Sequence, residues 1–264
     1  MYDIGFIGCG NMGGALARAA CKGGARIALH DLDTEKQNAL SKELNCDVPD
    51  LSALVASCRY VMLGVKPHQV RGMCEKITAL PDYAARVYVS MAAGVTTQQL
   101  SDMLPGAQVI RIMPNTPCAV GAGLITYCLN GLCSEASQTD FLHLMSAAGQ
   151  FDLLDEHLID AASAVAGCGP AFAALFMAAL ADGGVMCGLP RQKALLYAQQ
   201  MLLGTAKLAL ESQMHPGAMK DQVCSPGGST IAGVMALEEG AFRASVMRAV
   251  RAAHEKNTRL GKDE

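Results

Sequence analysis

The chain has 264 residues, a formal net charge of −3 and 51% hydrophobic residues, which allows a substantial core in one large domain or two smaller ones. This slightly acidic balance argues against a nucleic-acid-binding surface, which usually carries an excess of Lys and Arg. The eleven cysteines are odd in number and contain no C-x-x-C pair, so they indicate neither a disulfide framework nor a metal site; we expect a metal-free cytoplasmic protein.

The first half of the chain alternates strand-like and helix-like patterns, starting so close to Met1 that we expect no targeting segment. Met12, Leu16 and Ala19 mark a first helix, and Thr96 with Gln99 predicts a capping box. The alternation predicts an α/β fold with a parallel sheet covered on both faces. Short apolar runs predict strands at residues 4–7, 26–30, 60–65, 86–89, 109–113, 123–127 and 150–154.

A glycine-rich turn of the form G-x-G-x-x-G lies between the first strand and the first helix, and a second strand follows. Gly8 permits a tight turn, Gly10 lets a pyrophosphate approach the backbone, and Gly13 lets helix and strand pack closely. A glycine-rich turn without a ligand is the alternative. We predict that dinucleotide phosphates bind here, at Ile7, Gly8, Cys9, Gly10, Asn11, Met12 and Gly13.

Asp31 directly follows the second predicted strand, where an acidic residue would hydrogen-bond the adenosine ribose hydroxyls. Its carboxylate would repel a 2′-phosphate, and residues 30–33 contain no arginine to attract one. Asp31 therefore favours NADH over NADPH. The alternative is that Asp31 merely begins the turn before the helix near Thr34.

Three further loops follow strand ends, where ligands gather in open α/β sheets: residues 65–68, 92–94 and 113–117. Each could also be only a turn. The cofactor contacts predicted in these loops are Val65, Lys66, Pro67, Ala92, Ala93, Gly94 and Asn115.

After about Glu156 the strand signal stops and Ala-, Leu- and Met-rich helices follow, with breaks at 188–190, 215–217 and 226–228. This shift predicts a dinucleotide-binding domain over 1–156 and an all-α domain over 157–264. Residues 161–181 carry no charge and are long enough to span a bilayer, but they are Ala- and Gly-rich and interrupted at 167–170. We expect them at the centre of a helical domain or in a subunit interface.

The loop before the last helices is the most specific stretch. Pro226 and two glycines precede Ser229 and Thr230, which run into an apolar helical pattern. Such a bent backbone opens a helix whose first N–H groups could bind a carboxylate. An ordinary turn with an N-cap is the alternative.

Together these segments resemble pyrroline-5-carboxylate reductase over essentially the whole chain. The resemblance implies reduction of 1-pyrroline-5-carboxylate to L-proline with NADPH or NADH. It also implies an N-terminal Rossmann domain followed by an all-α C-terminal dimerisation domain. The matching segments are residues 5–13, 65–67, 92–96, 111–117, 167–172, 215–221 and 224–233.

Residue roles follow from the same resemblance. The loop of residues 225–230, the substrate loop, would hold the carboxylate on backbone N–H groups, with Thr230 beside the ring nitrogen. It would come from the neighbouring subunit of a homodimer or larger homo-oligomer. Residues 65–67 and 92–94 would line the nicotinamide half of the cofactor, and Glu156 would touch bound product. The substrate-binding residues would be Glu156, Ser225, Gly227, Gly228, Ser229 and Thr230.

The chain departs from the family pattern at three positions. Ser229 replaces a more usual threonine or alanine, and Gln222 stands where an asparagine often reaches the cofactor across the interface. Asp31 stands where many members place residues suited to the 2′-phosphate of NADPH. These departures concern cofactor preference more than the reaction.

The expected chemistry needs orientation and a proton, because hydride adds to a C=N carbon more readily when the nitrogen is protonated. Thr230 would be the catalytic residue, donating a hydrogen bond that orients the ring nitrogen. Lys66 is an alternative acid, but its position after a strand suits a cofactor-lining loop better. A β-hydroxyacid dehydrogenase would carry a lysine in residues 161–181, where there is none. A non-catalytic dinucleotide-binding relative would have a damaged loop, whereas residues 225–230 are complete.

Overall fold

The computed structural model describes residues 1–260. Its internal contacts divide the chain into two units, which we describe separately. The first contains residues 1–168 together with residues 253–260, and the second contains residues 169–252.

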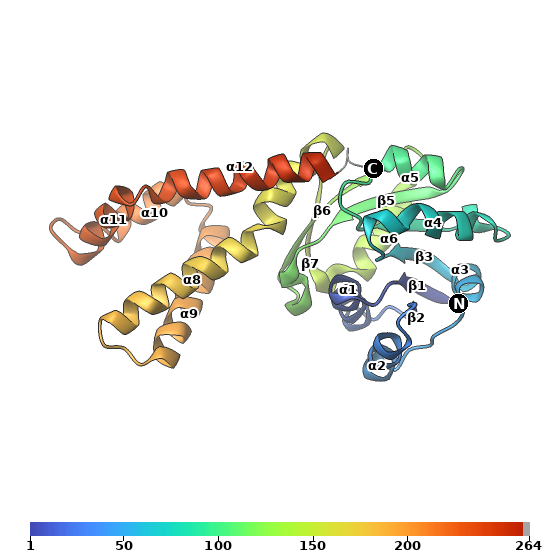
Figure 1. Cartoon of the computed structure of the whole chain (residues 1–264), viewed down its shortest axis with the longest axis horizontal. Helices are drawn as coiled ribbons and strands as arrows, with labels where there is room; N and C mark the ends of the chain where they lie inside the picture. The colour runs from blue at the N-terminus through green and yellow to red at the C-terminus, as the bar shows by residue number, and fades with distance from the viewer. Residues whose placement is uncertain (261–264) are drawn as a thin grey trace. The chain divides into compact units, whose positions relative to one another are not determined.

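The first unit is built on one seven-stranded sheet in the order β2-β1-β3-β4-β5-β6-β7 (Figure 1). Every predicted strand is present, with ends shifted by one or two residues, because short apolar runs are a strong local signal. The strands are β1 (Tyr2–Ile7), β2 (Ile27–His30), β3 (Cys58–Leu63), β4 (Val87–Ser90), β5 (Gln108–Met113), β6 (Gly123–Leu129) and β7 (Gly149–Leu153).

The direction of the last two strands differs from the prediction. Strands β1 to β5 are parallel, but β6 runs antiparallel to β5, with Ile112 opposite Tyr127, and β7 is parallel to β6. The predicted parallel sheet is therefore present in β1 to β5, but the pairing of β5 with β6 departs from it. The physical reason is the short connection of residues 114–122, which holds only the 3-10 turn η2 (Thr116–Val120), whereas a parallel crossover needs about a dozen residues or more.

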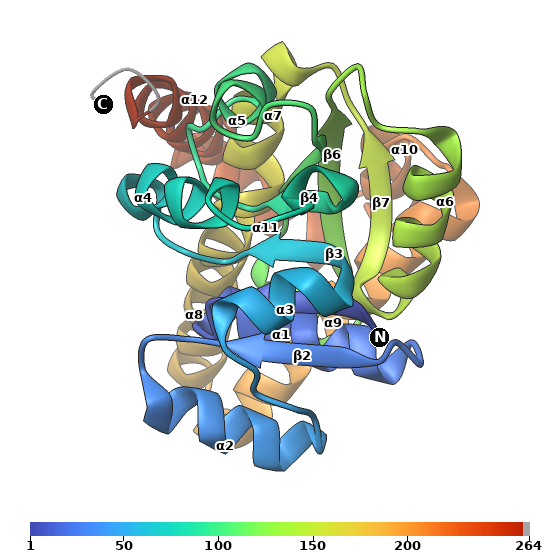
Figure 2. The same ribbon diagram turned by 90° about the vertical axis from the view of Figure 1, so that its right-hand side faces the viewer.

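Helices cover both faces of the sheet, as predicted (Figure 2). Side chains of β3 alternate between two cores: Tyr60 and Met62 face one, and Val61 and Leu63 face the other. The first core is closed by α1 (Asn11–Lys22), α2 (Thr34–Leu44) and α6 (Glu135–Leu144). The second is closed by α3 (Leu51–Ser57), α4 (Pro67–Thr78) and α5 (Thr97–Met103). Short 3-10 turns are η1 (Tyr83–Ala85) and η3 (Ser146–Ala148).

From residue 154 to 260 the chain forms no strand, in agreement with the composition shift. The predicted breaks separate helices that end or begin within a few residues of them. The elements are η4 (Glu156–Leu158), α7 (Ile159–Ala162), the π-helical turn η5 (Ser163–Gly167), α8 (Gly169–Met186), α9 (Arg191–Ser212), α10 (Pro216–Gln222), α11 (Ser229–Glu239) and α12 (Phe242–Leu260). At 167–170 the interruption is a π-helical turn followed by Cys168 rather than a loop.

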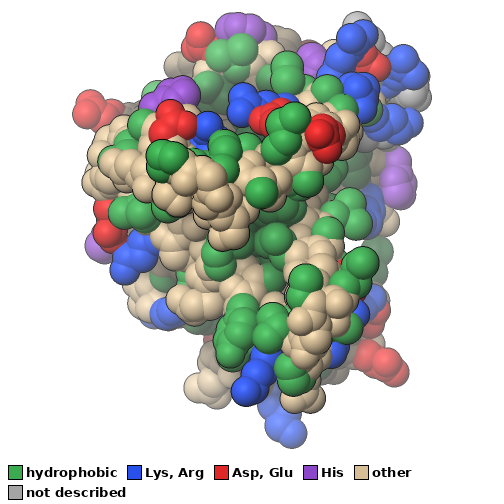
Figure 3. All heavy atoms as spheres, turned by 90° about the vertical axis from the view of Figure 1, so that its left-hand side faces the viewer, with side chains coloured by type: hydrophobic (Ala, Val, Ile, Leu, Met, Phe, Trp, Pro, Cys, Tyr) green, Lys and Arg blue, Asp and Glu red, His purple; other side chains and the backbone are tan. Residues whose placement is uncertain are grey.

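The second unit exposes an extensive apolar surface (Figure 3). The stretch Glu156–Met186 is apolar and long enough to cross a membrane, yet only 11% of its most apolar window is buried within the chain. Leu175 on α8 is 72% exposed and Leu210 on α9 is 70% exposed. A single chain therefore does not bury this helical stretch in its own core. An exposed apolar surface of this kind is typical of a surface that another molecule covers.

Candidate functional site

The glycine-rich turn joins β1 to α1 with little spare space. Gly8 has φ +106°, and a Cβ there would lie 2.6 Å from the carbonyl oxygen of Gly64. A Cβ on Gly13 would lie 2.2 Å from the carbonyl oxygen of Gly8, whereas a Cβ on Gly10 would meet no atom within 4 Å. The first and third glycines thus serve turn and packing, and the second leaves the backbone open to a ligand.

The N-terminus of α1 suits an anion. Gly10 is its N-cap residue, no side chain caps it, and its first turn holds no acidic residue. The first N–H groups of a helix lack intrahelical partners and lie at the positive end of its dipole. This arrangement fits the phosphates of a dinucleotide.

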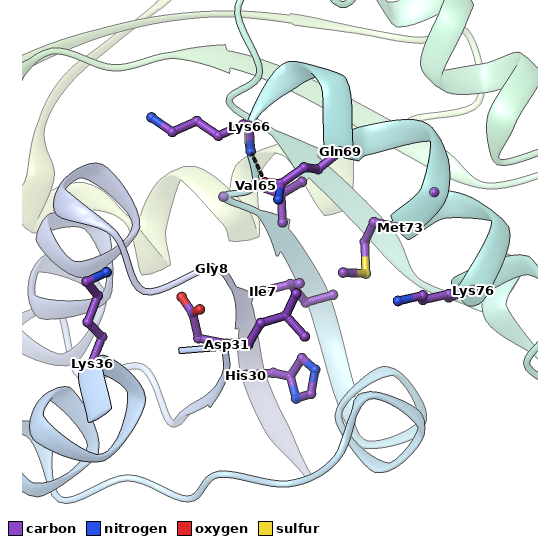
Figure 4. A pocket seen from close by; sticks show the side chains of 13 residues that line it. Ile7, Gly8, His30, Asp31, Lys36, Val65, Lys66, Gln69, Met73 and Lys76 are labelled. Carbon is purple, nitrogen blue, oxygen red and sulfur yellow. Dashed lines mark hydrogen bonds between the residues drawn. The ribbon is translucent and has the colours of Figure 1, made fainter. Parts of the chain in front are cut away.

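A cavity of about 460 Å³ opens at the carboxyl ends of β1, β2 and β3 (Figure 4). Strand order reverses at β1, and such a switch point is where open α/β sheets bind ligands. The cavity brings together five predicted cofactor residues: Ile7, Gly8, Asp31, Val65 and Lys66. Its other lining residues were not predicted: His30, Leu32, Lys36, Gly64, Gln69, Gly72, Met73 and Lys76.

The carboxylate of Asp31 is fixed beside the glycine-rich turn. Its Oδ2 accepts a hydrogen bond of 2.5 Å from the backbone N–H of Cys9, and its Oδ1 accepts one of 2.8 Å from Asp33. Asp33, rather than Asp31, caps α2. Asp31 is therefore an acidic group held at the mouth of the cavity.

Two lysines from helices on opposite faces of the sheet add positive charge to the cavity lining, which residues 30–33 alone do not indicate. Lys36 lies in the first turn of α2 and Lys76 in the last turn of α4. The Nζ atom of Lys36 lies 2.6 Å from Oδ2 of Asp33, and this contact raises the pKa of Lys36. Because a helix was predicted to begin near Thr34, the sequence could have placed Lys36 in its first turn, close to Asp31.

The loop after β4 is tied to the end of the strand by a hydrogen bond to a serine side chain. Gly94 has φ +79°, and the N–H of Ala92 donates to Oγ of Ser90 at 3.3 Å. Ala93 lies between them on the same loop. Residues 92–94 thus follow a strand end as predicted, and their contact with a cofactor stays a prediction.

Asn115 is buried, and both ends of its amide bind backbone groups. Nδ2 donates to the carbonyl of Ala166 at 3.0 Å, and Oδ1 accepts from the N–H of Leu124 at 3.1 Å. The amide therefore joins β6 and the segment before α8 to the end of β5. Its assignment as a cofactor contact stays a prediction.

Glu156 also has several protein partners. Oε1 accepts hydrogen bonds from the N–H of Thr97 at 2.7 Å and from Nη1 of Arg111 at 2.8 Å, and Oε2 accepts one from Oγ1 of Thr97 at 2.7 Å. Burial opposes ionisation of Glu156, but the hydrogen bonds from Thr97 and Arg111 outweigh it and lower the pKa. Glu156 is therefore a carboxylate at neutral pH, and its predicted contact with product is not tested.

The predicted substrate loop lies in the second unit and opens α11, as expected from its sequence. Gly227 has φ +68°, Gly228 is the N-cap residue, and no side chain caps the helix. A Cβ on Gly228 would lie 2.4 Å from Oγ of Ser225. Ser225, Ser229 and Thr230 are exposed, as is Gln222 at the end of α10. These residues gather in one unit, and the cofactor residues gather in the other.

Comparisons with known proteins agree with this reading along the whole chain. Residues 156–260 match the family described as pyrroline-5-carboxylate reductase dimerisation, and residues 3–94 match the family described as NADP oxidoreductase, coenzyme F420-dependent. The pyrroline-5-carboxylate reductase of Escherichia coli is 37% identical over 98% of both chains. That of Glycine max is 36% identical over 98% of this chain and 96% of its own.

Solved structures give the same result. The pyrroline carboxylate reductase of Plasmodium falciparum, solved with NADP bound, has a TM-score of 0.88 and 28% identity, with 98% of each chain covered. That of Coxiella burnetii has a TM-score of 0.88 and 29% identity over the same shares. The predicted fold class, a Rossmann domain followed by a helical dimerisation domain, is confirmed. The chain belongs to the pyrroline-5-carboxylate reductase family.

Proposed function

We propose that this protein reduces 1-pyrroline-5-carboxylate to L-proline by hydride transfer from NADH or NADPH. The observation that carries the proposal is the uncapped N-terminus of α11, opened by Gly227 and Gly228 and suited to a substrate carboxylate. It occurs in a chain whose other unit carries an open glycine-rich turn. A reductase needs both parts: one for the hydride donor and one for the acceptor.

In this proposal the protein supplies binding and orientation, and the bound dinucleotide supplies the hydride. The turn from Gly8 to Gly13 binds the pyrophosphate, while residues 65–67 and 92–94 border the nicotinamide. N–H groups at 228–230 hold the substrate carboxylate. The hydroxyl of Thr230, in the first turn of α11, donates a hydrogen bond to the ring nitrogen and passes a proton from water, since an unassisted hydroxyl is a poor acid.

We further propose that residues 1–156 bind the dinucleotide, and that residues 157–264 carry the substrate loop and the dimer contacts. The exposed apolar surface of α8 and α9 supports a homodimer or larger homo-oligomer. Each active site would combine the cofactor cavity of one chain with the loop of its neighbour, where Gln222 would approach the cofactor. Because a second subunit would cover this apolar surface, no membrane is needed to bury it. We therefore propose a cytoplasmic protein that binds neither membrane nor nucleic acid.

The activity is tested by following NADH and NADPH oxidation with 1-pyrroline-5-carboxylate. We expect turnover in the wild type and a kcat about 100-fold lower in Thr230→Ala, since a donor to the reacting group is lost. Ser229→Ala, which removes the adjacent hydroxyl, is the matched control and should keep kcat within about threefold. No turnover with either cofactor would refute the proposed activity, and an unchanged Thr230→Ala rate would refute the role of Thr230.

Cofactor preference is proposed to favour NADH, because Asp31 is held at the cavity mouth and Lys36 is engaged by Asp33. We expect a lower KM for NADH than for NADPH. Asp31→Asn should raise the KM for NADH and lower that for NADPH, each about tenfold, the size of one hydrogen bond to a charged group. Glu35→Gln, which changes the charge equally on α2 outside the cavity lining, should shift neither. A wild-type KM that is lower for NADPH would contradict the role of Asp31.

A further inference from the structure

The loop between β4 and α5 is held at both of its ends. At the β4 end, Oγ of Ser90 accepts a hydrogen bond from the N–H of Ala92. At the α5 end, the carboxylate of Glu156 binds both the N–H and the hydroxyl of Thr97, each at 2.7 Å. Thr97 is the first residue of α5, so Glu156 satisfies a backbone donor that the helix itself leaves unpaired. This anchor comes from outside the loop, 59 residues along the chain.

Arg111 fixes Glu156 in turn. Its side chain is only 4% exposed, and its Nη1 donates to the same Oε1 atom that binds the N–H of Thr97. Its Nη2 lies 3.9 Å from Oδ1 of Asp160. Arg111 stands beside Ser90 in the register of β5 and β4, so both ends of the loop are tied to neighbouring positions of the sheet. A carboxylate that accepts three hydrogen bonds, one of them from a buried guanidinium, has a well-defined position.

The segment that begins with Glu156 is held at two further points. Nδ2 of Asn257 donates to the carbonyl of Asp160 at 3.2 Å, and Nδ2 of Asn115 donates to the carbonyl of Ala166. The backbone that carries Glu156 is therefore held in place within the first unit. Movement of this segment would have to break both of these contacts, and movement of the Glu156 carboxylate would have to break its hydrogen bonds to Thr97 and Arg111.

We propose that Glu156 is a positioning residue for the nicotinamide: through Thr97 it fixes the loop of residues 92–96, and Arg111 fixes Glu156. It acts through Thr97 rather than by contact with product. The inference rests on the proposed function only in that residues 92–94 border the nicotinamide. The geometry of Glu156, Thr97 and Arg111 itself does not depend on the substrate.

The test compares NADH with ADP-ribose, which lacks the nicotinamide, by calorimetry on the full-length protein. Glu156→Gln keeps the shape of the side chain but removes its charge. We expect it to weaken NADH binding about tenfold and to leave ADP-ribose binding within about twofold, since only the nicotinamide side of the site is loosened. Thr97→Val, which removes one of the three bonds, should weaken NADH about threefold.

Asp160→Asn is the matched control, because it alters the other carboxylate facing Arg111 without touching Thr97. It should leave both affinities unchanged. The double variant Thr97→Val/Glu156→Gln should bind NADH no more weakly than Glu156→Gln alone, since the two changes break one shared contact.

Three results would overturn the proposal. Equal weakening of NADH and ADP-ribose binding in Glu156→Gln would show that Glu156 supports the fold in general and does not position the nicotinamide. Weakened binding of L-proline with unchanged NADH would make Glu156 a direct product contact. Fully additive effects of Thr97→Val and Glu156→Gln on NADH binding would mean that the two residues act independently and not through their shared contact. The NADH and ADP-ribose measurements concern the dinucleotide alone, so they remain decisive even if the protein does not reduce 1-pyrroline-5-carboxylate.

Discussion

Replacing Gly13 by alanine is expected to lower the free energy of unfolding by about 3 kcal/mol and to weaken NADH binding at least about 100-fold. The new Cβ would lie 2.2 Å from the carbonyl oxygen of Gly8. That oxygen belongs to backbone in a left-handed conformation whose N–H donates to His30, so no flexible side chain can yield. Helix α1 must move instead, and its first N–H groups would leave the phosphate position. Chemical denaturation and calorimetry with NADH measure the two effects.

Two neighbouring glycines are the controls for this variant. A Cβ on Gly14 would lie 3.2 Å from the flexible end of Arg18 and at ordinary contact distance, 3.7 Å, from Cys9 and Leu40, so Gly14→Ala should keep stability and NADH binding. Gly10→Ala adds a methyl group where no atom lies within 4 Å, so it should fold normally and yet weaken NADH binding. Wild-type NADH affinity in Gly13→Ala would contradict the assignment of the turn as the phosphate site.

The features that sequence predicted well are local. The capping box is confirmed: Oγ1 of Thr96 accepts from the N–H of Gln99, and the side chain of Gln99 accepts from the N–H of Thr96. The bend before α11 follows from Gly227, whose φ of +68° suits glycine. Such features depend on a few adjacent residues, so their pattern suffices without knowledge of the fold.

The features that sequence missed depend on tertiary contacts. Nothing near Glu156 in sequence indicates that its carboxylate binds Thr97, 59 residues earlier. Lys76 reaches the cavity from the far end of α4, which depends on how that helix lies over the sheet. The antiparallel direction of β6 is an exception, since it follows from the sequence: the connection 114–122 is too short for a crossover helix.

The apolar helix at 161–181 shows a different limit. Its composition predicts that it is covered, but it cannot tell whether the cover comes from the same chain or from another. In the structure, Leu203 is 64% exposed on α9 and Met247 is 71% exposed on α12, in addition to the surface of α8. Apolar area of this kind gains about 25 cal/mol per Å² when buried, which favours association of chains.

If the active site is shared between chains, two inactive variants should restore activity when combined. Gly10→Val would block the pyrophosphate at a position where the new Cβ has no atom within 4 Å. Gly227→Val would distort the substrate loop, because φ is +68° there. Each variant alone should have under about 1% of wild-type activity, since each lacks one half of every site.

Co-expression of the two variants should recover about a quarter of the wild-type rate, because half of randomly formed dimers are mixed and each mixed dimer has one intact site. In that site the wild-type turn of one chain meets the wild-type loop of the other. Different affinity tags on the two chains allow the mixed dimers to be purified, and these should have about half of the wild-type rate. The separately purified variants, combined without subunit exchange, are the control and should stay inactive. Inactive mixed dimers of normal stability would mean that each active site is built within a single chain, since then every site in the mixed dimer would carry one of the two lesions.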